Sequence, residues 1–350
     1  MESPPRARTD PARLKRWGSL LAVLLVVGLA PFVTIPVLVL EPGPAPDLAG
    51  RTEISAPTYP SRGSFHLTTT QIKSVEGSKL ARILAAIIDP DKSVLPRESV
   101  YPRGYSRKQT EGVQAAQMTQ SENSAVVAAL RELGLPYEPD GVAVVRVSRE
   151  ADALQKLRAG DVILAADGKP VVRLGDLNGA VAALSVGQPI RLSVRRGEAI
   201  EEVLVRTITS RFNRGKAILG ISAEQHYRAP VEVKVDNKDI GGPSAGLMLA
   251  LSIYDLLTPE DLTGGRKIAG TGTIDNRPER IGVVGKVGAM DQKIESARRI
   301  GATIFIAPRA EAEDARRAAP PQMKVIGVRS LHEAIAALRE LGPPRSSQTK

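Results

Sequence analysis

A serine before an apolar segment is the first residue of this chain whose position suggests chemistry. Ser244 lies in the sequence GPSAG, three residues before the start of the apolar run 247–257. If that run is a helix, the serine hydroxyl lies near unpaired N–H groups and the positive end of the helix dipole. Such a position favours a serine alkoxide and could hold a tetrahedral oxyanion. The structural alternative is an N-cap serine, which is common at this place in a helix.

The same segment satisfies G-x-S-x-G, the nucleophile pattern of α/β-hydrolases, and that interpretation requires a downstream histidine. His332 alone lies downstream, in the sequence LHEAIAALREL, where a position on a helix surface explains it better. The roughly 110 residues after Ser244 are also few for the remainder of that fold. A Ser–His α/β-hydrolase is therefore the less favoured alternative.

Without a suitable histidine, a lysine would have to act as the general base. A free lysine, with a pKa near 10.4, is neutral only about 0.04% of the time at pH 7. Lowering that pKa by about three units costs roughly 4 kcal/mol, so the base must lie in a desolvated, apolar site. Ile294 and Ala297 mark a buried helix stripe beside Lys293, although the pattern alone fits an exposed lysine equally well. The candidates downstream of the serine are Lys267, Lys286, Lys293 and Lys324.

Residues 241–275 and 287–308 (VGAMDQKIESARRIGATIFIAP) resemble the catalytic domain of Lon peptidases. More narrowly, the chain is similar to the bacterial membrane-anchored group in which a PDZ domain precedes that domain. The resemblance implies an ATP-independent serine endopeptidase with a Ser–Lys dyad and the fold of ribosomal protein S5 domain 2. It assigns Ser244 as nucleophile, Lys293 as general base and Thr271, in AGTGTI, as the residue that orients the lysine.

Two positions depart from the family pattern. Gly241 replaces the acid that ATP-dependent Lon enzymes carry three residues before the serine, as it does in the membrane-anchored group. Ala289 stands where a Gly-Gly pair is usual, and its methyl group would crowd the loop beneath Lys293. The sequence contains neither G-x-x-x-x-G-K-[ST] nor H-E-x-x-H, so we expect no cofactor, no metal and no ATPase module in this chain.

The elements around Ser244 alternate between strand and helix, which predicts an α+β domain. A different succession precedes it: a valine-rich strand at 141–147, a turn with Gly160–Asp161 and Asp167–Gly168, and a short helix followed by two strands. This order resembles a PDZ domain, whose groove would bind an extended peptide as an added strand. The nearest candidate for a carboxylate-binding loop is LGLPY, residues 133–137. Further strands are expected at 65–70, 189–197, 201–208, 217–221, 231–235, 267–271, 303–306 and 325–328, and helices at 79–88, 121–133, 176–184, 244–257, 291–300 and 331–341.

Residues 17–40 carry no charge and, as a helix, would span a hydrocarbon core about 30 Å thick. Basic residues dominate the segment before them and acidic residues the segment after, which predicts a cytoplasmic N-terminus. We therefore expect a single-pass cell-membrane protein with an extracytoplasmic catalytic domain. The alternative is a cleaved signal peptide, but the run is long for one, and Pro31 follows the small-residue site at 28–30.

The formal charge of +10 does not indicate nucleic acid, because the basic residues are scattered and aromatics make up only 3%. The expected partners are polypeptide substrates, unfolded ones especially, and a homo-oligomer is compatible. A rival hypothesis is a non-catalytic membrane-anchored PDZ scaffold. The predicted segments are a cytoplasmic N-terminus (1–16), a transmembrane helix (17–40), a Pro-rich linker (41–60), a membrane-proximal strand and helix segment (61–114), a PDZ-like β-rich domain (115–208), a Lon-type protease domain (209–342) and a disordered tail (343–350).

Overall fold

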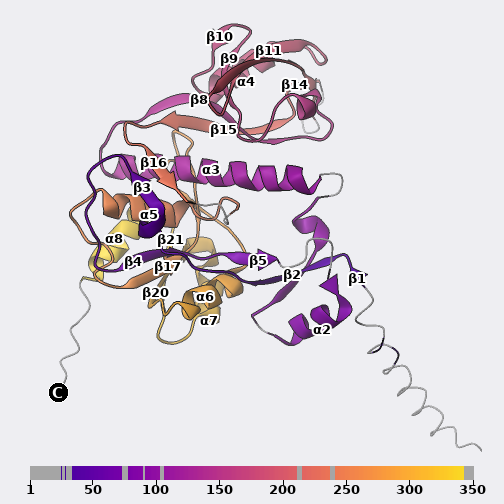
Figure 1. Ribbon diagram of the computed structural model, residues 1–350. Coiled ribbons are helices and arrows are strands. Elements are labelled where there is room, and N and C mark those ends of the chain that lie inside the picture. The colour runs from indigo at the N-terminus through magenta and orange to yellow at the C-terminus, as the bar shows by residue number, and fades with distance from the viewer. Residues whose placement is uncertain are drawn as a thin grey trace, which may run out of the picture. The chain divides into compact units, whose positions relative to one another are not determined.

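The computed structural model describes residues 25, 28, 34–72, 78–89, 91–102, 106–210, 215–236 and 241–342. The chain divides into two compact units, of which the first contains residues 1–41 and 71–102 and the second contains 42–70 and 103–350. Figure 1 labels their elements. The sequence predictions for residues 1–16 and 343–350 lie outside the described residues.

The described part of the first unit contains short strands and the helix α2. One strand pair and one three-stranded sheet, in the order β5–β2–β7, make up its framework. The hydrophobic residues of the central strand are buried there. Its elements are β1 (Thr34–Ile35), β2 (Val37–Pro42), β5 (Thr70–Ile72), β6 (Ser78–Lys79), α2 (Leu80–Ile88), β7 (Ser93–Pro96) and the 3₁₀ turn η2 (Arg97–Ser99).

The prediction of a transmembrane helix over 17–40 is wrong, because its last third forms β1 and β2. Pro36 interrupts a helix at this point, and the neighbouring β-branched residues favour a strand. Leu38 and Val39 are 0% and 2% exposed, so this hydrophobic run is buried in protein. Among the described helices, none combines the length and apolar character needed to span a bilayer. Apart from Leu25 and Gly28, residues 17–33 lie outside the described part.

One part of the second unit is a mainly antiparallel sheet in the order β12–β11–β9–β8–β15, with β10 paired to β9. Its apolar residues alternate along the strands, as in β11, where Ile190, Leu192 and Val194 are all fully buried. The short helix α4 packs against β15 and β14. The elements are β8 (Glu138–Val147), η3 (Asp152–Gln155), β9 (Val162–Ala166), β10 (Lys169–Pro170), α4 (Leu174–Ala182), β11 (Pro189–Arg196), β12 (Ala199–Arg206), β13 (Ile208–Thr209), β14 (Ala217–Ile218) and β15 (Ile221–Arg228).

The other part is a parallel sheet in the order β21–β20–β17–β4 with helices on both faces. Ile304 and Ile306 of β20 pack with α5 and α8, whereas Phe305 between them packs with α6 and α7. Burial on both faces explains the continuous apolar sequence of this strand. The elements are β3 (Thr52–Ile54), β4 (Ser64–Leu67), β16 (Val233–Val235), α5 (Gly246–Leu256), β17 (Lys267–Gly270), β18 (Thr273–Ile274), β19 (Val284–Gly285), α6 (Met290–Arg299), β20 (Ile304–Pro308), α7 (Ala312–Ala318), β21 (Lys324–Val328), α8 (Leu331–Glu340) and the 3₁₀ turns η1 (Ala49–Arg51) and η4 (Arg309–Glu311).

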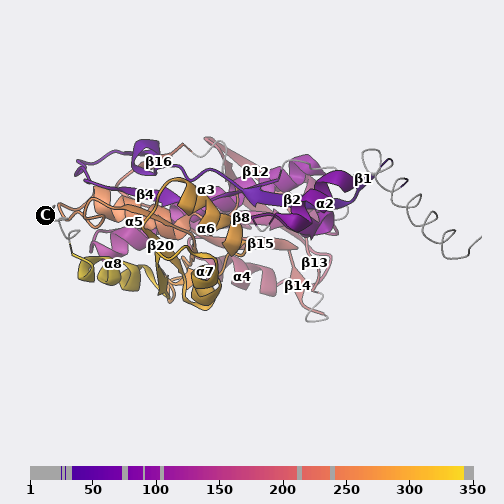
Figure 2. The ribbon, with the colours of Figure 1, turned by 90° about the horizontal axis from the view of Figure 1, so that it is seen from below.

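The predicted α+β class is therefore corrected to mixed α/β, because parallel strands alternate with helices in this sheet. The helix observed here is longer than the one expected at 121–133, because α3 spans Arg107–Glu132. Its N-cap is Ser106, which accepts a hydrogen bond from Gln109 N in a capping box. α3 and α5 lie side by side in both views (Figures 1 and 2).

Candidate functional site

Ser244 lies in the turn that leads into α5, on the same side of the parallel sheet as α3. The helix begins at Gly246, and its N-cap residue is Ala245, which makes no side-chain cap. Ser244 is therefore not the N-cap, and the first N–H groups of α5 lie next to it. The segment that follows β17 holds this turn, because Gly272 N–H donates a hydrogen bond to the Ser244 carbonyl oxygen over 3.0 Å.

Gly246 has a steric role in this turn. A Cβ atom at this position would lie 2.9 Å from Ile274 N and 3.0 Å from Ser121 Oγ. α5 therefore starts in close contact with α3 and with the segment that follows β17. Any side chain here would push the serine turn away from these neighbours.

Thr271 lies directly after β17, where the carboxyl end of a parallel strand commonly places functional residues. It is 0% exposed. Its hydroxyl donates a hydrogen bond to the Ser244 carbonyl oxygen over 3.2 Å and accepts one from Lys293 Nζ over 2.9 Å. The three residues that the sequence singles out are thus joined by one short chain of hydrogen bonds.

Lys293 reaches this point from α6, on the opposite face of the sheet from α5. The side chain is 4% exposed, while the other three candidate lysines, Lys267, Lys286 and Lys324, are exposed. Burial lowers the pKa of Lys293 to about 8, and the negative charge of Glu311 opposes that effect. A lysine with this pKa is neutral in roughly a tenth of the molecules at pH 7. Lys293 is therefore able to act as a base near neutral pH.

The loop before α6 is held by an acid that the sequence did not single out. Glu311 accepts hydrogen bonds from the N–H groups of Val287 and Gly288, both over 2.9 Å. The next residue, Ala289, has φ 56° and ψ 44°, a left-handed conformation that costs a non-glycine residue about 1–2 kcal/mol. The crowding expected at Ala289 thus takes the form of backbone strain at the N-cap of α6.

The histidines have other contacts. His332 Nδ1 lies 2.9 Å from Glu132 Oε2 in an exposed pair at the end of α3. His66 lies on β4, where its ring contacts Ser64 and the carbonyl of Ala45. His226 lies on β15. These contacts offer no support for a Ser–His pair at Ser244.

A groove of about 310 Å³ lies between α4 and the segment from Ala217 to Ala223. Gly220, with φ 70°, forms the bend before β15, and the edge of β15 opens into the groove. Such an edge beside a helix can bind an extended peptide as an added strand. Residues 133–137, the candidate carboxylate-binding loop of the sequence, follow the end of α3, where Leu135 N–H donates to the Leu130 carbonyl.

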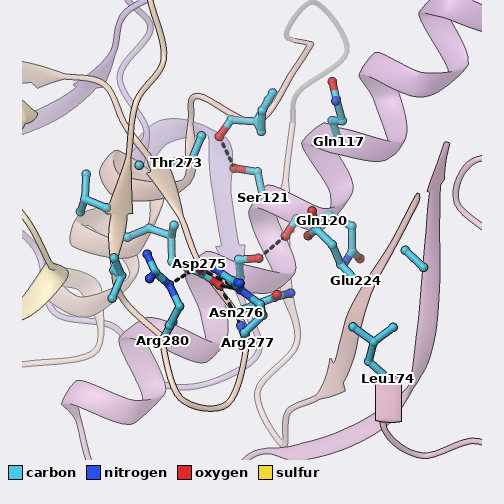
Figure 3. Close-up of a pocket in the computed structure, with 17 residues that line it drawn as sticks. Gln117, Gln120, Ser121, Leu174, Glu224, Thr273, Asp275, Asn276, Arg277 and Arg280 are labelled. Carbon is cyan, nitrogen blue, oxygen red and sulfur yellow. Dashed lines mark hydrogen bonds and ion pairs between the residues drawn. The ribbon is translucent and has the colours of Figure 1, made fainter. Parts of the chain in front are cut away.

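A second cavity, of about 430 Å³, is bounded by α3, β15 and the segment that follows Gly272 (Figure 3). Its polar walls carry the two guanidinium groups of Arg277 and Arg280, both paired with Asp275. Glu224 faces them from β15. Its side chain is open to the cavity, and the surrounding protein raises its pKa by desolvation.

Residues 112–207 match the sequence family described as the PDZ domain. A search of curated proteins found no significant match. The chain is similar to the PDZ domain of an SdrC-like protein from Listeria monocytogenes, with 24% identity over 24% of this chain and 87% of that one, at a TM-score of 0.23. The corresponding domain from Listeria innocua is 25% identical over 25% of this chain and 97% of that one, with a TM-score of 0.23. A solution structure from Geobacillus thermodenitrificans is 25% identical over 24% of this chain and 95% of that one, with a TM-score of 0.23.

Proposed function

The chain contains a PDZ domain at residues 112–207, and from that premise we propose that it is a serine endopeptidase of the Lon type. Ser244 is the nucleophile and Lys293 the general base of an ATP-independent Ser–Lys dyad. The observation that carries the proposal is the buried Lys293 Nζ, held 2.9 Å from the Thr271 hydroxyl, which in turn bonds the Ser244 carbonyl. The PDZ domain supports a polypeptide as the substrate.

In the first half of the reaction, the neutral amine of Lys293 accepts the proton of the Ser244 hydroxyl. The serine oxygen then forms a bond to the carbonyl carbon of the scissile peptide. The carbonyl oxygen becomes an oxyanion, which the N–H groups at the start of α5 stabilise. When this intermediate collapses, the C–N bond breaks and the Lys293 ammonium gives its proton to the leaving amine.

In the second half, Lys293 removes a proton from water, and the resulting hydroxide attacks the acyl-enzyme. The bond between Ser244 and the acyl group breaks, and the serine oxygen recovers a proton from Lys293. Thr271 acts as a positioning residue throughout, because its hydroxyl accepts from the amine and so fixes where the Nζ atom lies. The PDZ domain supplies affinity for an extended chain rather than chemistry.

A second candidate function is a PDZ scaffold that binds polypeptides without cleaving them, and the presence of the PDZ domain favours it equally. The two functions differ in turnover. A scaffold would bind a peptide in the groove with the same affinity whether or not Ser244 is present, and would release it intact.

The deciding experiment measures cleavage of casein and of a fluorogenic peptide by the full chain. We expect Ser244→Ala and Lys293→Ala to abolish turnover, because one removes the nucleophile and the other the base. Lys267→Ala is the matched control: that lysine is exposed, bonds the Ile300 carbonyl and should be dispensable. Wild-type protein that binds peptides but cleaves none of them would exclude the endopeptidase and leave the scaffold.

A further inference from the structure

The peptide groove and the polar cavity share a wall. Leu174, the first residue of α4, and Ala223, on β15, line both spaces. Along β15, Ile221 and Ala223 belong to the groove, while Ala223 and Glu224 belong to the cavity. The two spaces therefore follow one another along the same strand.

The edge of β15 is open only over its first half. β15 is the last strand of its sheet, so one edge is available at the groove. At Gln225 that availability ends, because its carbonyl accepts a hydrogen bond from Asn276 Nδ2 over 2.9 Å. Farther on, Asn123 of α3 bonds both the N–H and the carbonyl of Tyr227. A polypeptide that runs along β15 must leave the strand near Glu224 and enter the cavity.

The residue that precedes Ser244 in the chain also lines the cavity. Pro243 lines the cavity, and its carbonyl accepts a hydrogen bond from Ser121 Oγ over 3.1 Å. Thr273, two residues after Thr271, lines it as well. A chain that crosses the cavity thus arrives next to the proposed nucleophile.

One buried side chain connects the elements that line the groove with those that line the cavity. Gln225 is 2% exposed, and its Nε2 atom donates to the carbonyls of Gly141 and Val172, both over 2.9 Å. Its Oε1 atom accepts from Leu174 N–H over 3.0 Å, which anchors the start of α4. Because the Gln225 carbonyl is bonded to Asn276, the same residue connects α4 to the cavity wall.

We propose that one extended polypeptide occupies both spaces, with its free C-terminus in the groove and its upstream residues against the Ser244 turn. The inference rests on the proposed peptidase function, and it makes this chain a protease that cuts upstream of a docked C-terminus. The bend at Gly220, which has φ 70° and lines the groove, is the position that we assign to the terminal carboxylate. In the N-to-C direction the substrate then runs from Glu224 towards Gly220, antiparallel to β15.

The linings define the chemical class of substrate. The side chains that line the groove are apolar except for Asn178, so it takes a C-terminal aliphatic side chain. The cavity places Glu224 opposite the paired Arg277 and Arg280, so it takes polar, solvated upstream residues. The groove lining that contacts the C-terminal residue includes Leu177, Val181, Ile218, Leu219 and Ile221.

A photocrosslinking experiment tests the path without any need for turnover. The probe is a peptide that ends in valine with a free carboxylate and carries benzoylphenylalanine about four to eight residues upstream, since an extended chain advances about 3.3 Å per residue. With the full chain carrying Ser244→Ala, we expect crosslinks to cavity residues such as Gln117 or Thr273. Amidation of the probe should reduce them about tenfold or more. Crosslinks confined to the groove, or unaffected by amidation, would overturn the proposal.

Cleavage by the wild-type chain gives the second test. The free-carboxylate peptide should be cut with a kcat/KM about tenfold or more above that of its amide. Ala223→Arg should remove this preference by blocking the shared wall, whereas Ser222→Arg, on the exposed neighbouring position, should keep it. Equal cleavage of both peptides by the wild type contradicts the shared path. If neither peptide is cut, the peptidase itself fails, and the crosslinks alone decide the path.

Discussion

The buried amine of Lys293 sets the pH dependence of the proposed chemistry. Its pKa is lowered to about 8 by burial, and only the neutral form can accept the serine proton. We therefore expect kcat/KM for peptide cleavage to rise with pH through an apparent pKa near 8. A pH–rate profile of the wild-type chain measures this directly. A rise centred near pH 6.5 would instead indicate a histidine base.

The same lysine should lower the stability of the fold at neutral pH. With a pKa of 10.5 when unfolded and about 8 when folded, it loses a proton on folding between these values, so stability rises with pH across that window. Lys293→Met should raise the free energy of unfolding at pH 7 by up to about 3 kcal/mol, less the lost hydrogen bond to Thr271. Urea unfolding at several pH values measures the difference, which should vanish near pH 10.5. A constant difference would show that charge burial is not its cause.

At the scale of single residues, the sequence could propose Ser244, Thr271 and Lys293 but could not choose among the lysines on physical grounds. Burial of Lys293 depends on how α6 packs against the sheet, and the local pattern fits a buried or an exposed lysine equally. The contact of Glu311 with the loop before α6 could not be predicted from the sequence either. Glu311 bonds a loop more than twenty residues away in the chain, and no local spacing indicates such a contact.

At the scale of elements, the strained residue before α6 predicts whether a glycine substitution raises or lowers the free energy of unfolding. Ala289→Gly should raise the free energy of unfolding by about 0.5–1 kcal/mol, because glycine adopts the left-handed conformation without the penalty of a Cβ atom. Ala336→Gly in α8 is the matched control and should lower it by about 1 kcal/mol. Thermal or urea unfolding compares the two. Equal destabilisation by both variants would mean that Ala289 is not strained.

An ion pair stabilises the antiparallel sheet β12–β11–β9–β8–β15, called here the PDZ sheet. It joins β11 to the turn before β9. Arg196 of β11 bonds both carboxylate oxygens of Asp161, over 2.8 and 2.7 Å, and Asp161 is 1% exposed. Arg196→Met should destabilise this part of the chain by about 3 kcal/mol, because it leaves a buried charge without its partner. Arg191→Met, on the exposed face of the same strand, should change stability by less than about 0.5 kcal/mol. Loss of peptide binding on warming gives the readout, and equal effects would contradict the argument.

Helices and strands were predicted correctly where the hydrophobic periodicity agreed with the turn residues that bound each element. The prediction failed where hydrophobicity alone was used. The strands and helix of the PDZ region follow valine alternation and glycine turns, and the PDZ domain is confirmed. The transmembrane prediction treated 17–40 as one apolar helix, although Pro36 and the β-branched residues around it favour strands. Apolar content by itself cannot distinguish burial in lipid from burial in protein. α3 was underestimated because its first half is too polar to show a helical stripe.

For the whole molecule, Gln225 should couple peptide binding to catalysis. Gln225→Met removes the amide that bonds Gly141, Val172 and Leu174, at a cost of about 1–3 kcal/mol. We expect both the affinity for a C-terminal peptide and the kcat/KM of its cleavage to fall, with circular dichroism unchanged. Gln188→Met, at an exposed loop position, is the control. A loss of affinity with unchanged cleavage of the same peptide would separate the two functions.

The edge strand β4 has a consequence for biosynthesis. Residues 64–67 pair in parallel with β17 at residues 267–270, and the whole PDZ sheet is encoded between them. On the ribosome, β4 emerges first and must wait for about 200 residues of synthesis, or roughly 10–40 s at 5–20 residues per second, before its partner exists. The PDZ part can fold during that interval, while Phe65 and Leu67 remain uncovered. The nascent chain should therefore depend on chaperones most at this stage, and the site around Ser244 cannot form until Thr271 and Lys293 have been synthesised.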